Sequence, residues 1–544
     1  MTVRGIVPAI ILVVLCVGIA SGQAAGPTPV YCAANNPTPP PVRVEGYAEL
    51  TADIVLTCTG GAPPADSGSG AAATATSSNA IPQMTVTVGF GIPLTNTPVA
   101  SRSLGAGGLS EAVLLVDEPG SGGSSYGANV PISVCPTSTA AAWVSAASPG
   151  CQEWVGNIGA NSNVPVLSTS GQTNTTPGYN AFPGVVSGNT VTFNGVPMLP
   201  PASGTTRVFR ITNVRLNSSV IGTITPPSTV TIDAAVITSG GGLGGISNNL
   251  AIPVAVVSSQ LSTTLQNSSD AAALTPPVFS RSAGAGSPGA PTLVGYLRFG
   301  EGVPNSFRTR VNYVSGSSGS GQSGSAIQNI PGMIFTGESG FTPYVGTTPQ
   351  YFGGNTTYIP GLADMGTRVK AVFSIPAGVT IYAGTSSGGN TSSGLSVSMV
   401  SSPTAPESAA LVTPTVTVGG VGFVPLVPSG GTATATWEVI TPATNPNLTP
   451  EVFDIPVAVY AAPGAGPGTV TVAMSYAPTQ SDVQSDPIPE FAGASTSDPL
   501  LTFGSTAENT PAPSSLILVL CALGALGLFA ARRNLAARQG NRAS

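Results

Sequence analysis

The chain has 544 residues, of which 7% are charged, and its 16 lysines and arginines against 22 aspartates and glutamates give a net charge of −6. Phosphate binding depends on clusters of lysine and arginine, and Lys370 is the single lysine here, so we expect no nucleic-acid partner. Histidine is absent, which excludes histidine-dependent catalytic triads and removes the commonest metal ligand. We expect no cofactor.

The first 24 residues have the pattern of a secretory signal peptide. Arg4 precedes an apolar run from Ile6 to Ala20, and small residues follow up to Ala24. A short positive region, an apolar core and a small-residue cleavage site are typical of a signal that is removed during export. We therefore expect an exported protein.

Four cysteines remain between the two apolar ends of the chain, namely Cys32, Cys58, Cys135 and Cys151. An even number in an exported chain predicts disulfides, with three possible connectivities. We favour Cys32–Cys58 and Cys135–Cys151, because each pair closes a short loop. A zinc site made of all four is the alternative, although the chain has no Cys-x-x-Cys pair to support it.

Short runs rich in valine, isoleucine and phenylalanine predict many β-strands. Gln83–Phe90 alternates strictly and places Met84, Val86, Val88 and Phe90 on one face. In Thr432–Ile440 the small apolar residues and Trp437 face one way, which predicts a core position for this tryptophan. Other predicted strands are 52–58, 111–117, 189–196, 207–216, 229–237, 251–265, 292–299, 307–314, 367–375, 379–383, 395–400, 415–423, 453–461 and 469–476.

These strands, separated by turn residues and long loops rich in Gly, Ser, Thr and Pro, predict an all-β protein with two or more β-sandwich-like domains. The clearest linker candidate is Ser268–Pro291, which is rich in small residues and proline. We expect a signal peptide at 1–24, an N-terminal β-sandwich region with the four cysteines at 25–267, a linker at 268–291, a second β-sandwich region at 292–477, an acidic stalk at 478–510 and a hydrophobic C-terminal tail at 511–544.

The C-terminal tail has three parts. Pro511, Pro513 and two serines precede the apolar run Leu516–Ala531, and a basic end follows with Arg532 and Arg533. As a helix the run spans about 24 Å, somewhat less than the ~30 Å hydrocarbon core of a bilayer. Flanking arginine stems can extend that reach. The tail is therefore expected to contact the membrane through a C-terminal helix.

This tail resembles the PEP-CTERM sorting signal of Gram-negative bacteria, although Ala512 stands where that family usually has glutamate between the prolines. The resemblance implies recognition by an exosortase and delivery to the cell surface or the extracellular polysaccharide. A plain single-pass anchor, with its arginines held on the inner side, is the alternative.

Segments of the ectodomain resemble a second group, secreted proteins of soil bacteria. They are Arg43–Gly61, Arg298–Gly302 with Phe307–Arg310, and Ala435–Val439. This resemblance implies an exported β protein and brings no particular activity with it.

Several residue patterns could carry chemistry. Gly123–Gly127 fits a nucleophile elbow around Ser125 but lies in a loop of a chain without histidine, so we interpret it as a chance match. Paired carboxylates could hydrolyse glycosides, exposed aromatic side chains could stack on sugars, and clustered acids could bind calcium. The acids considered for hydrolysis are Glu45, Glu49, Asp53, Glu301, Glu338 and Asp364; the aromatic residues are Trp143, Trp154, Tyr344, Tyr351 and Tyr358; and the acids considered for calcium are Asp117, Glu118, Asp482, Asp486 and Glu490.

None of these patterns has the spacing of a dedicated site. We therefore predict a non-enzymatic cell-surface or extracellular-matrix protein with a structural or adhesive role. A glycan-binding surface module is one alternative, for which rows of exposed aromatic side chains would be the evidence. A carboxylate-dependent glycoside hydrolase is the other, for which two acids facing each other in a cleft would be the evidence.

Overall fold

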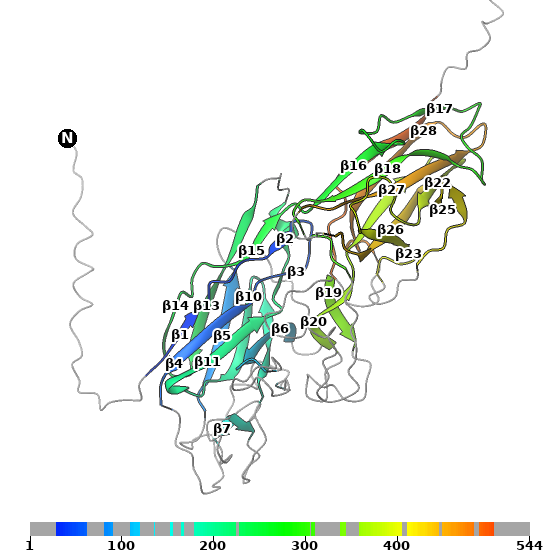
Figure 1. Ribbon diagram of the computed structural model, residues 1–544. Coiled ribbons are helices and arrows are strands. Elements are labelled where there is room, and N and C mark those ends of the chain that lie inside the picture. The colour runs from blue at the N-terminus through cyan, green and yellow to red at the C-terminus, as the bar shows by residue number, and fades with distance from the viewer. Residues whose placement is uncertain are drawn as a thin grey trace, which may run out of the picture.

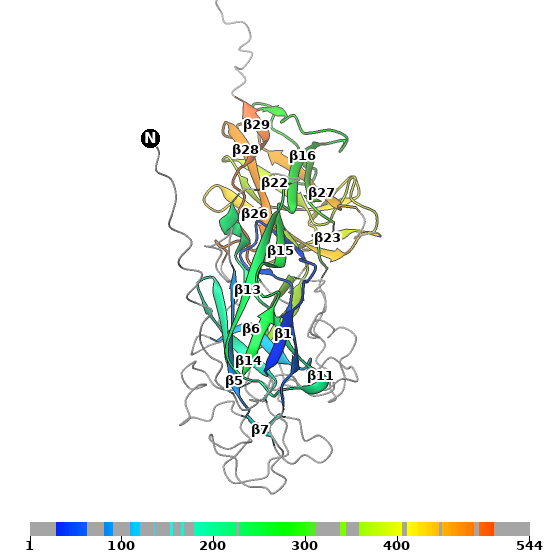
Figure 2. The same cartoon turned by 90° about the vertical axis from the view of Figure 1, so that its left-hand side faces the viewer.

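The computed structural model describes residues 29–504, with gaps at 63–80, 91–108, 120–134, 136–152, 156–164, 168–178, 223, 225–227, 305, 310–337, 344–357, 405–410, 445–448 and 483–488. The predicted signal peptide and C-terminal tail both lie outside these ranges. Within them, no helix is long and apolar enough to cross a membrane. The described residues form two β regions that lie end to end (Figures 1 and 2).

The first region is built on one eleven-stranded sheet. Its strand order is β14-β1-β4-β11-β6-β9-β10-β5-β13-β15-β2. The strands are β1 (Val30–Ala34), β2 (Pro41–Arg43), β4 (Ile54–Gly60), β5 (Gln83–Phe90), β6 (Leu109–Val116), β9 (Ala181–Ser187), β10 (Thr190–Pro197), β11 (Ala202–Thr212), β13 (Val230–Gly240), β14 (Leu243–Ser247) and β15 (Ile252–Ser258). Two small sheets, β3 (Glu49–Leu50) with β12 (Arg215–Leu216) and β7 (Glu153–Val155) with β8 (Pro165–Leu167), and a short 3-10 helix η2 (Ser218–Ile221) complete it.

This sheet folds over a single core. Apolar residues from strands far apart in the sheet order, such as Cys32 of β1 and Val254 of β15, belong to the same buried cluster. The alternation predicted for β5 is confirmed, since Met84, Val86 and Val88 are buried while the residues between them are half-buried. Period-two burial places one face of each strand in the core and leaves the other to solvent.

A disulfide joins strands β1 and β4 of this core. Cys32 of β1 and Cys58 of β4 lie directly opposite each other in the antiparallel ladder and are bonded, as predicted. Cys135 is also disulfide-bonded, whereas Cys151 lies outside the described residues, so the pairing of these two stays a prediction.

We expect the double substitution Cys32→Ala/Cys58→Ala to lower the free energy of unfolding by about 2–4 kcal/mol, because the bridge restricts the unfolded chain. The bridge is buried in the sheet, so the loss should appear as a lower urea midpoint rather than as a changed fold. Urea titration followed by circular dichroism measures it, with the single exposed substitution Tyr31→Ser on the same strand as control. An unchanged midpoint would contradict the structural role of this bridge.

The second region consists of two six-stranded sheets, with orders β16-β18-β27-β22-β25-β24 and β17-β29-β28-β21-β26-β23. Their strands are β16 (Leu261–Asn267), β17 (Val278–Ser280), β18 (Thr292–Glu301), β21 (Arg368–Ser374), β22 (Val379–Gly384), β23 (Ser396–Val400), β24 (Val416–Val418), β25 (Val421–Pro425), β26 (Thr432–Thr441), β27 (Val452–Ala461), β28 (Gly468–Ala477) and β29 (Asp498–Gly504). A separate hairpin is formed by β19 (Glu338–Pro343) and β20 (Tyr358–Met365).

The two six-stranded sheets share one buried core, which makes the second region a β-sandwich. Trp437 of β26 lies fully inside it, as its sequence pattern predicted, with its ring 6.3 Å from that of Phe299 on β18. All-β architecture in several sheets is therefore confirmed.

The linker predicted at 268–291 belongs to the second sandwich. Its β17 pairs in parallel with β29, Ala285 bridges to Ala461, and the Tyr382 hydroxyl donates to the Pro288 carbonyl. The chain instead passes from one region to the other at Ser259 and Gln260, between β15 and β16. The stretch predicted as one strand, 251–265, is two strands of different sheets. The sequence did not reveal this break, because no Gly or Pro stands at the crossing.

The predicted stalk is also part of the fold as far as the described residues extend. β29 pairs with β28 in the second sandwich, and Phe491 bridges back to Gly46 of the first region. The segment 505–510 lies outside the described ranges. The predicted linker and the predicted stalk therefore both contribute strands, β17 and β29, to the second sandwich.

Candidate functional site

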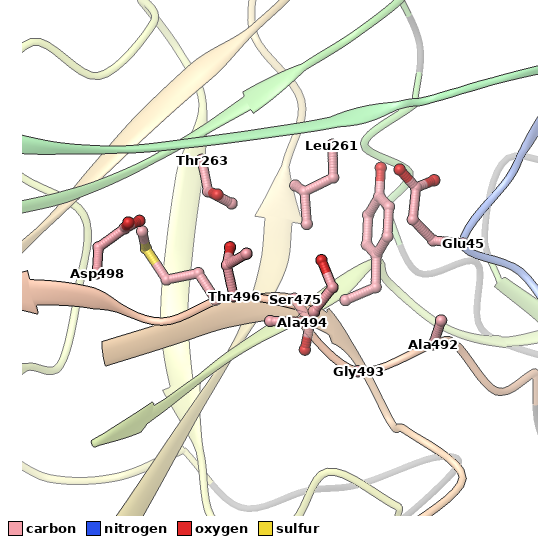
Figure 3. Close-up of a pocket in the computed structure, with 12 residues that line it drawn as sticks. Glu45, Leu261, Thr263, Ser475, Ala492, Gly493, Ala494, Thr496 and Asp498 are labelled. Carbon is pink, nitrogen blue, oxygen red and sulfur yellow. The ribbon is translucent and has the colours of Figure 1, made fainter. Parts of the chain in front are cut away.

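A polar groove opens along one edge of the second sandwich, beside its junction with the first region (Figure 3). It has a volume of about 200 Å³. One wall is the edge strand β16 through Leu261 and Thr263, and the floor is β28 through residues 474–476. The opposite wall is the segment 492–496, which leads into β29 at Asp498.

Two carboxylates lie at the two ends of this groove (Figure 3). Glu45 comes from the first region, where its Oε1 accepts the Ser259 hydroxyl at 2.9 Å. Burial raises the pKa of Glu45 above its usual range, although hydrogen bonds from Ser259 and the Gln260 backbone oppose the rise. Asp498, the first residue of β29, is exposed. No lysine or arginine is among the described residues that line the groove.

The junction beside the groove is held together by Arg43. This buried arginine bonds Glu49 at 3.0 Å, and its guanidinium lies 5.3 Å from the ring centroid of Tyr476 and 4.7 Å from that of Phe491. Tyr476 in turn donates its hydroxyl to the Gln260 carbonyl. Cation–π contacts of a desolvated arginine are worth about 2 kcal/mol, so this cluster fixes the two regions to each other.

The acids predicted for hydrolysis in the first region are not grouped around a cleft. Glu49 pairs with Arg43, Asp53 pairs with Arg210 at 3.1 Å, and Glu45 holds the crossing at Ser259. Each of these three carboxylates therefore has its own structural partners. Glu338 and Asp364 lie on the β19–β20 hairpin, and their side chains are not described.

The acids predicted for calcium at the end of β6 are bonded to arginines. Asp117 pairs with Arg207 at 3.3 Å, and Glu118 pairs with Arg210 at 2.7 Å. Burial raises the pKa of Asp117 to about 6, although Arg207 opposes the rise. Because each of these carboxylates is already paired with an arginine, little negative charge remains at this site to bind a calcium ion.

The later calcium candidates are also separate. Asp482 pairs with Lys370 at 3.1 Å, and Asp486 lies outside the described residues. The backbone carbonyl of Glu490 accepts a hydrogen bond from the Tyr47 amide. Within the described ranges, no group of three or more potential metal ligands occurs.

A third acidic cluster lies on β18 and β27 and was not predicted. Arg298 bonds both Asp270 and Asp454, at 3.0 and 2.8 Å, and Asp270 also accepts the Asn390 amide. Burial and the neighbouring Asp454 raise the pKa of Asp270. The cluster fastens the loop around Asn390 to the sheet. Its charges come from three distant parts of the sequence, so no local signal reveals it.

Glu301 and Glu451 form a buried acidic pair that no described lysine or arginine joins in a salt bridge. Glu301 accepts the backbone amides of Phe307 and Glu451, and burial together with the Glu451 charge raises its pKa to about 7. Glu451 accepts the Ala443 amide at Oε1, while its Oε2 has no hydrogen-bond partner in the described part of the chain. Burial raises the pKa of Glu451 as well.

Because the pKa of Glu301 is higher in the folded chain, the folded state holds this proton more tightly than the unfolded state, and stability falls as pH rises from about 4.5 to about 7. We expect Glu451→Gln to raise the free energy of unfolding at pH 8 by about 1 kcal/mol, the equivalent of roughly one pKa unit, and to change it little at pH 4. Urea titrations at both pH values measure the difference. Asp233→Asn, in the first region, is the control for loss of one negative charge, and equal gains at both pH values would contradict the prediction.

The aromatic residues considered for sugar stacking divide between two situations, whereas Trp437 is in the core, as predicted. Trp143, Tyr344 and Tyr351 lie outside the described residues. Trp154 lies on β7 and Tyr358 on β20, and the side chains of both are not described. The Ser125 motif also lies outside the described residues. Among the described large apolar side chains, Tyr31 is the one strongly exposed aromatic, so no row of exposed rings is found there.

Comparison with known proteins adds no assignment. No family model matches the chain, and no curated protein matches it. The Streptococcus agalactiae AgI/II polypeptide BspA C-terminal domain aligns with 85% of this chain and 100% of its own, at 8% identity and a TM-score of 0.24. The CupB6 tip adhesin from Pseudomonas aeruginosa aligns with 86% and 99%, at 10% identity and a TM-score of 0.12. Scores this low do not establish a shared fold.

Proposed function

We propose that this is an exported, non-enzymatic protein of the cell surface or extracellular matrix, with a structural or adhesive role. The observation that carries the proposal is how the charged residues are placed. Buried or half-buried cations of both regions bond carboxylates internally: Arg43, Arg207, Arg210, Arg298, Arg368 and Lys370. These charges are therefore used inside the two β regions, whose solubility depends on Ser, Thr, Asn and Gly.

Two further features support export and attachment. Disulfides persist in oxidising compartments, and this chain has the buried Cys32–Cys58 bridge. The tail, with Pro511, Pro513, Arg532 and Arg533 around its apolar run, would hold the protein at the envelope, where an exosortase and extracellular polysaccharide are the partners that its PEP-CTERM resemblance implies.

Deleting the gene in the native host and restoring the full chain tests this proposal. We expect deletion to reduce surface attachment or matrix cohesion and the full chain to restore it. The same cultures are assayed for release of reducing sugars from the host's polysaccharide. Sugar release that depends on the protein would support a hydrolase instead, and unchanged attachment and cohesion would contradict the adhesive role.

A further inference from the structure

We propose that the groove beside β16 binds an extended peptide segment that carries a lysine or arginine, and that this segment adds as a strand to the free edge of β16. The inference rests on the proposed adhesive role and names the class of partner for it. Its evidence comes from three independent features of the groove: the hydrogen-bond pattern of β16, the small side chains of the facing wall, and the charge of the two ends.

The hydrogen-bond pattern shows which backbone groups of β16 lack partners. The Glu301 amide donates to the Glu451 carbonyl, so residues 297, 299 and 301 of β18 bond to β27, and the residues between them bond to β16. Their partners are residues 262, 264 and 266 of β16. In an antiparallel ladder the intervening residues direct both backbone groups outward.

Those outward residues are Leu261, Thr263 and Leu265. The carbonyl of Leu265 accepts the Leu274 amide at 2.8 Å, which confirms the direction. No described residue forms a backbone hydrogen bond with the outward groups of Leu261 or Thr263, and both residues line the groove. An unpaired edge of this kind is a template for strand addition, in which main-chain bonds provide affinity.

The facing wall leaves room for another backbone. It is formed by Ala492, Gly493 and Ala494 followed by serine and threonine, and a Cβ built on Gly493 would meet nothing within 4 Å. Small side chains permit the close approach that main-chain pairing requires. At one end of the free edge, Tyr476 donates its hydroxyl to the Gln260 carbonyl. At the other end, Leu265 and Asn267 already bond the backbone of Leu274 and Ala272, so the peptide would pair with Leu261 and Thr263 between them.

The charge of the groove selects a basic peptide. Its two ionisable lining groups apart from the Tyr476 phenol are Glu45 and Asp498, and no lining cation balances them. A lysine or arginine on the added strand would pair with Asp498, which is exposed. Complementary charge of this kind favours one class of partner over others.

The test uses the full chain and a fluorescent, acetylated ten-residue peptide of alternating threonine and valine with one central arginine. A matched peptide has glutamine in place of the arginine. We expect fluorescence anisotropy to show saturable binding of the arginine peptide to the native chain. The glutamine peptide should bind about fivefold more weakly, and so should the arginine peptide to the Asp498→Asn variant. This is the loss expected from removing an exposed ion pair of up to about 1 kcal/mol. The two losses should not add, because they remove the same pair.

Thr263→Pro removes the outward amide without removing a bond to β18, and proline is tolerated on edge strands. We expect it to weaken peptide binding at least about tenfold, the equivalent of one main-chain bond or more. Thr417→Pro is the matched control: its amide also faces outward, on the edge strand β24, because Val418 and Val421 close the adjacent two-residue turn. Thermal unfolding of both variants checks that they remain folded.

Three results would overturn the inference: no binding of either peptide, equal binding by Thr263→Pro and the native chain, or displacement of the peptide by neutral oligosaccharides at equal or lower concentration. The attachment assay in the host separates this inference from the proposed function. If deletion of the gene abolishes attachment while Thr263→Pro retains it fully, the adhesive role stands and the groove is not its site.

Discussion

Substitution of Arg43 by methionine is expected to lower the free energy of unfolding by about 3–5 kcal/mol, the usual cost of leaving one partner of a buried ion pair alone. Arg43 and Glu49 are 3.0 Å apart, and both side chains are only 3% exposed. Methionine keeps most of the length of the side chain but leaves the Glu49 carboxylate buried without its cation. It also removes the guanidinium from the rings of Tyr476 and Phe491.

The result should also be visible in cooperativity. Arg43 belongs to the first region, whereas both aromatic rings belong to the second, so the substitution weakens the junction that couples them. We expect urea unfolding, followed by circular dichroism and tryptophan fluorescence, to separate into two transitions in Arg43→Met. The double variant Arg43→Met/Glu49→Gln, which removes the stranded charge, should regain part of the loss. Equal midpoints for Arg43→Met and the native chain would show that the junction does not depend on this residue.

Local patterns were sufficient where a strand is buried on one face only. Gln83–Phe90 was predicted with its observed bounds, because period-two alternation reports such burial directly. Thr432–Ile440 was predicted with nearly its observed bounds from the same alternation, although Thr436 and Glu438 on its other face are buried as well. Val30–Ala34 was not predicted as a strand, since prolines stand on both sides of it and it is too short for its alternation to be distinctive. β29 was read as part of a stalk because acidic and proline residues surround it.

Domain limits were less predictable, since the composition of a segment does not show which strands it pairs with. Ser268–Pro291 has the composition of a linker, but it covers the second sandwich and supplies β17. The true crossing at Ser259 and Gln260 carries no turn signal. It is fixed by tertiary bonds instead: Glu45 accepts from Ser259, and the Gln260 carbonyl accepts from Tyr476.

The groove could not be predicted from the sequence, because its parts are far apart in the chain. Glu45, residues 261–263, 474–476 and 492–498 meet only when the two regions are joined. The sequence did single out Glu45, but as one of three acids near each other along the chain. Proximity in sequence was the wrong criterion for grouping these acids, since Glu49 is bonded to Arg43 and Asp53 to Arg210.

Replacement of Trp437 by alanine is the second change for which we expect a large effect. The side chain is fully buried in the second sandwich, and its indole N–H donates to the Gly384 carbonyl at 2.8 Å. Removing a buried tryptophan costs about 3–5 kcal/mol through lost apolar contact and the cavity that remains. For a region of this size the melting temperature should fall by roughly 10 °C.

Two variants separate packing from hydrogen bonding at this position. Trp437→Phe keeps an aromatic ring beside Phe299 but leaves the Gly384 carbonyl without its donor, so we expect a smaller loss of about 1–3 kcal/mol. Val427→Ala, at a side chain that is 86% exposed in the same sandwich, is the control and should leave the melting temperature unchanged. If Trp437→Ala melted no lower than Trp437→Phe, the apolar contacts around the indole would contribute little to the stability of this sandwich.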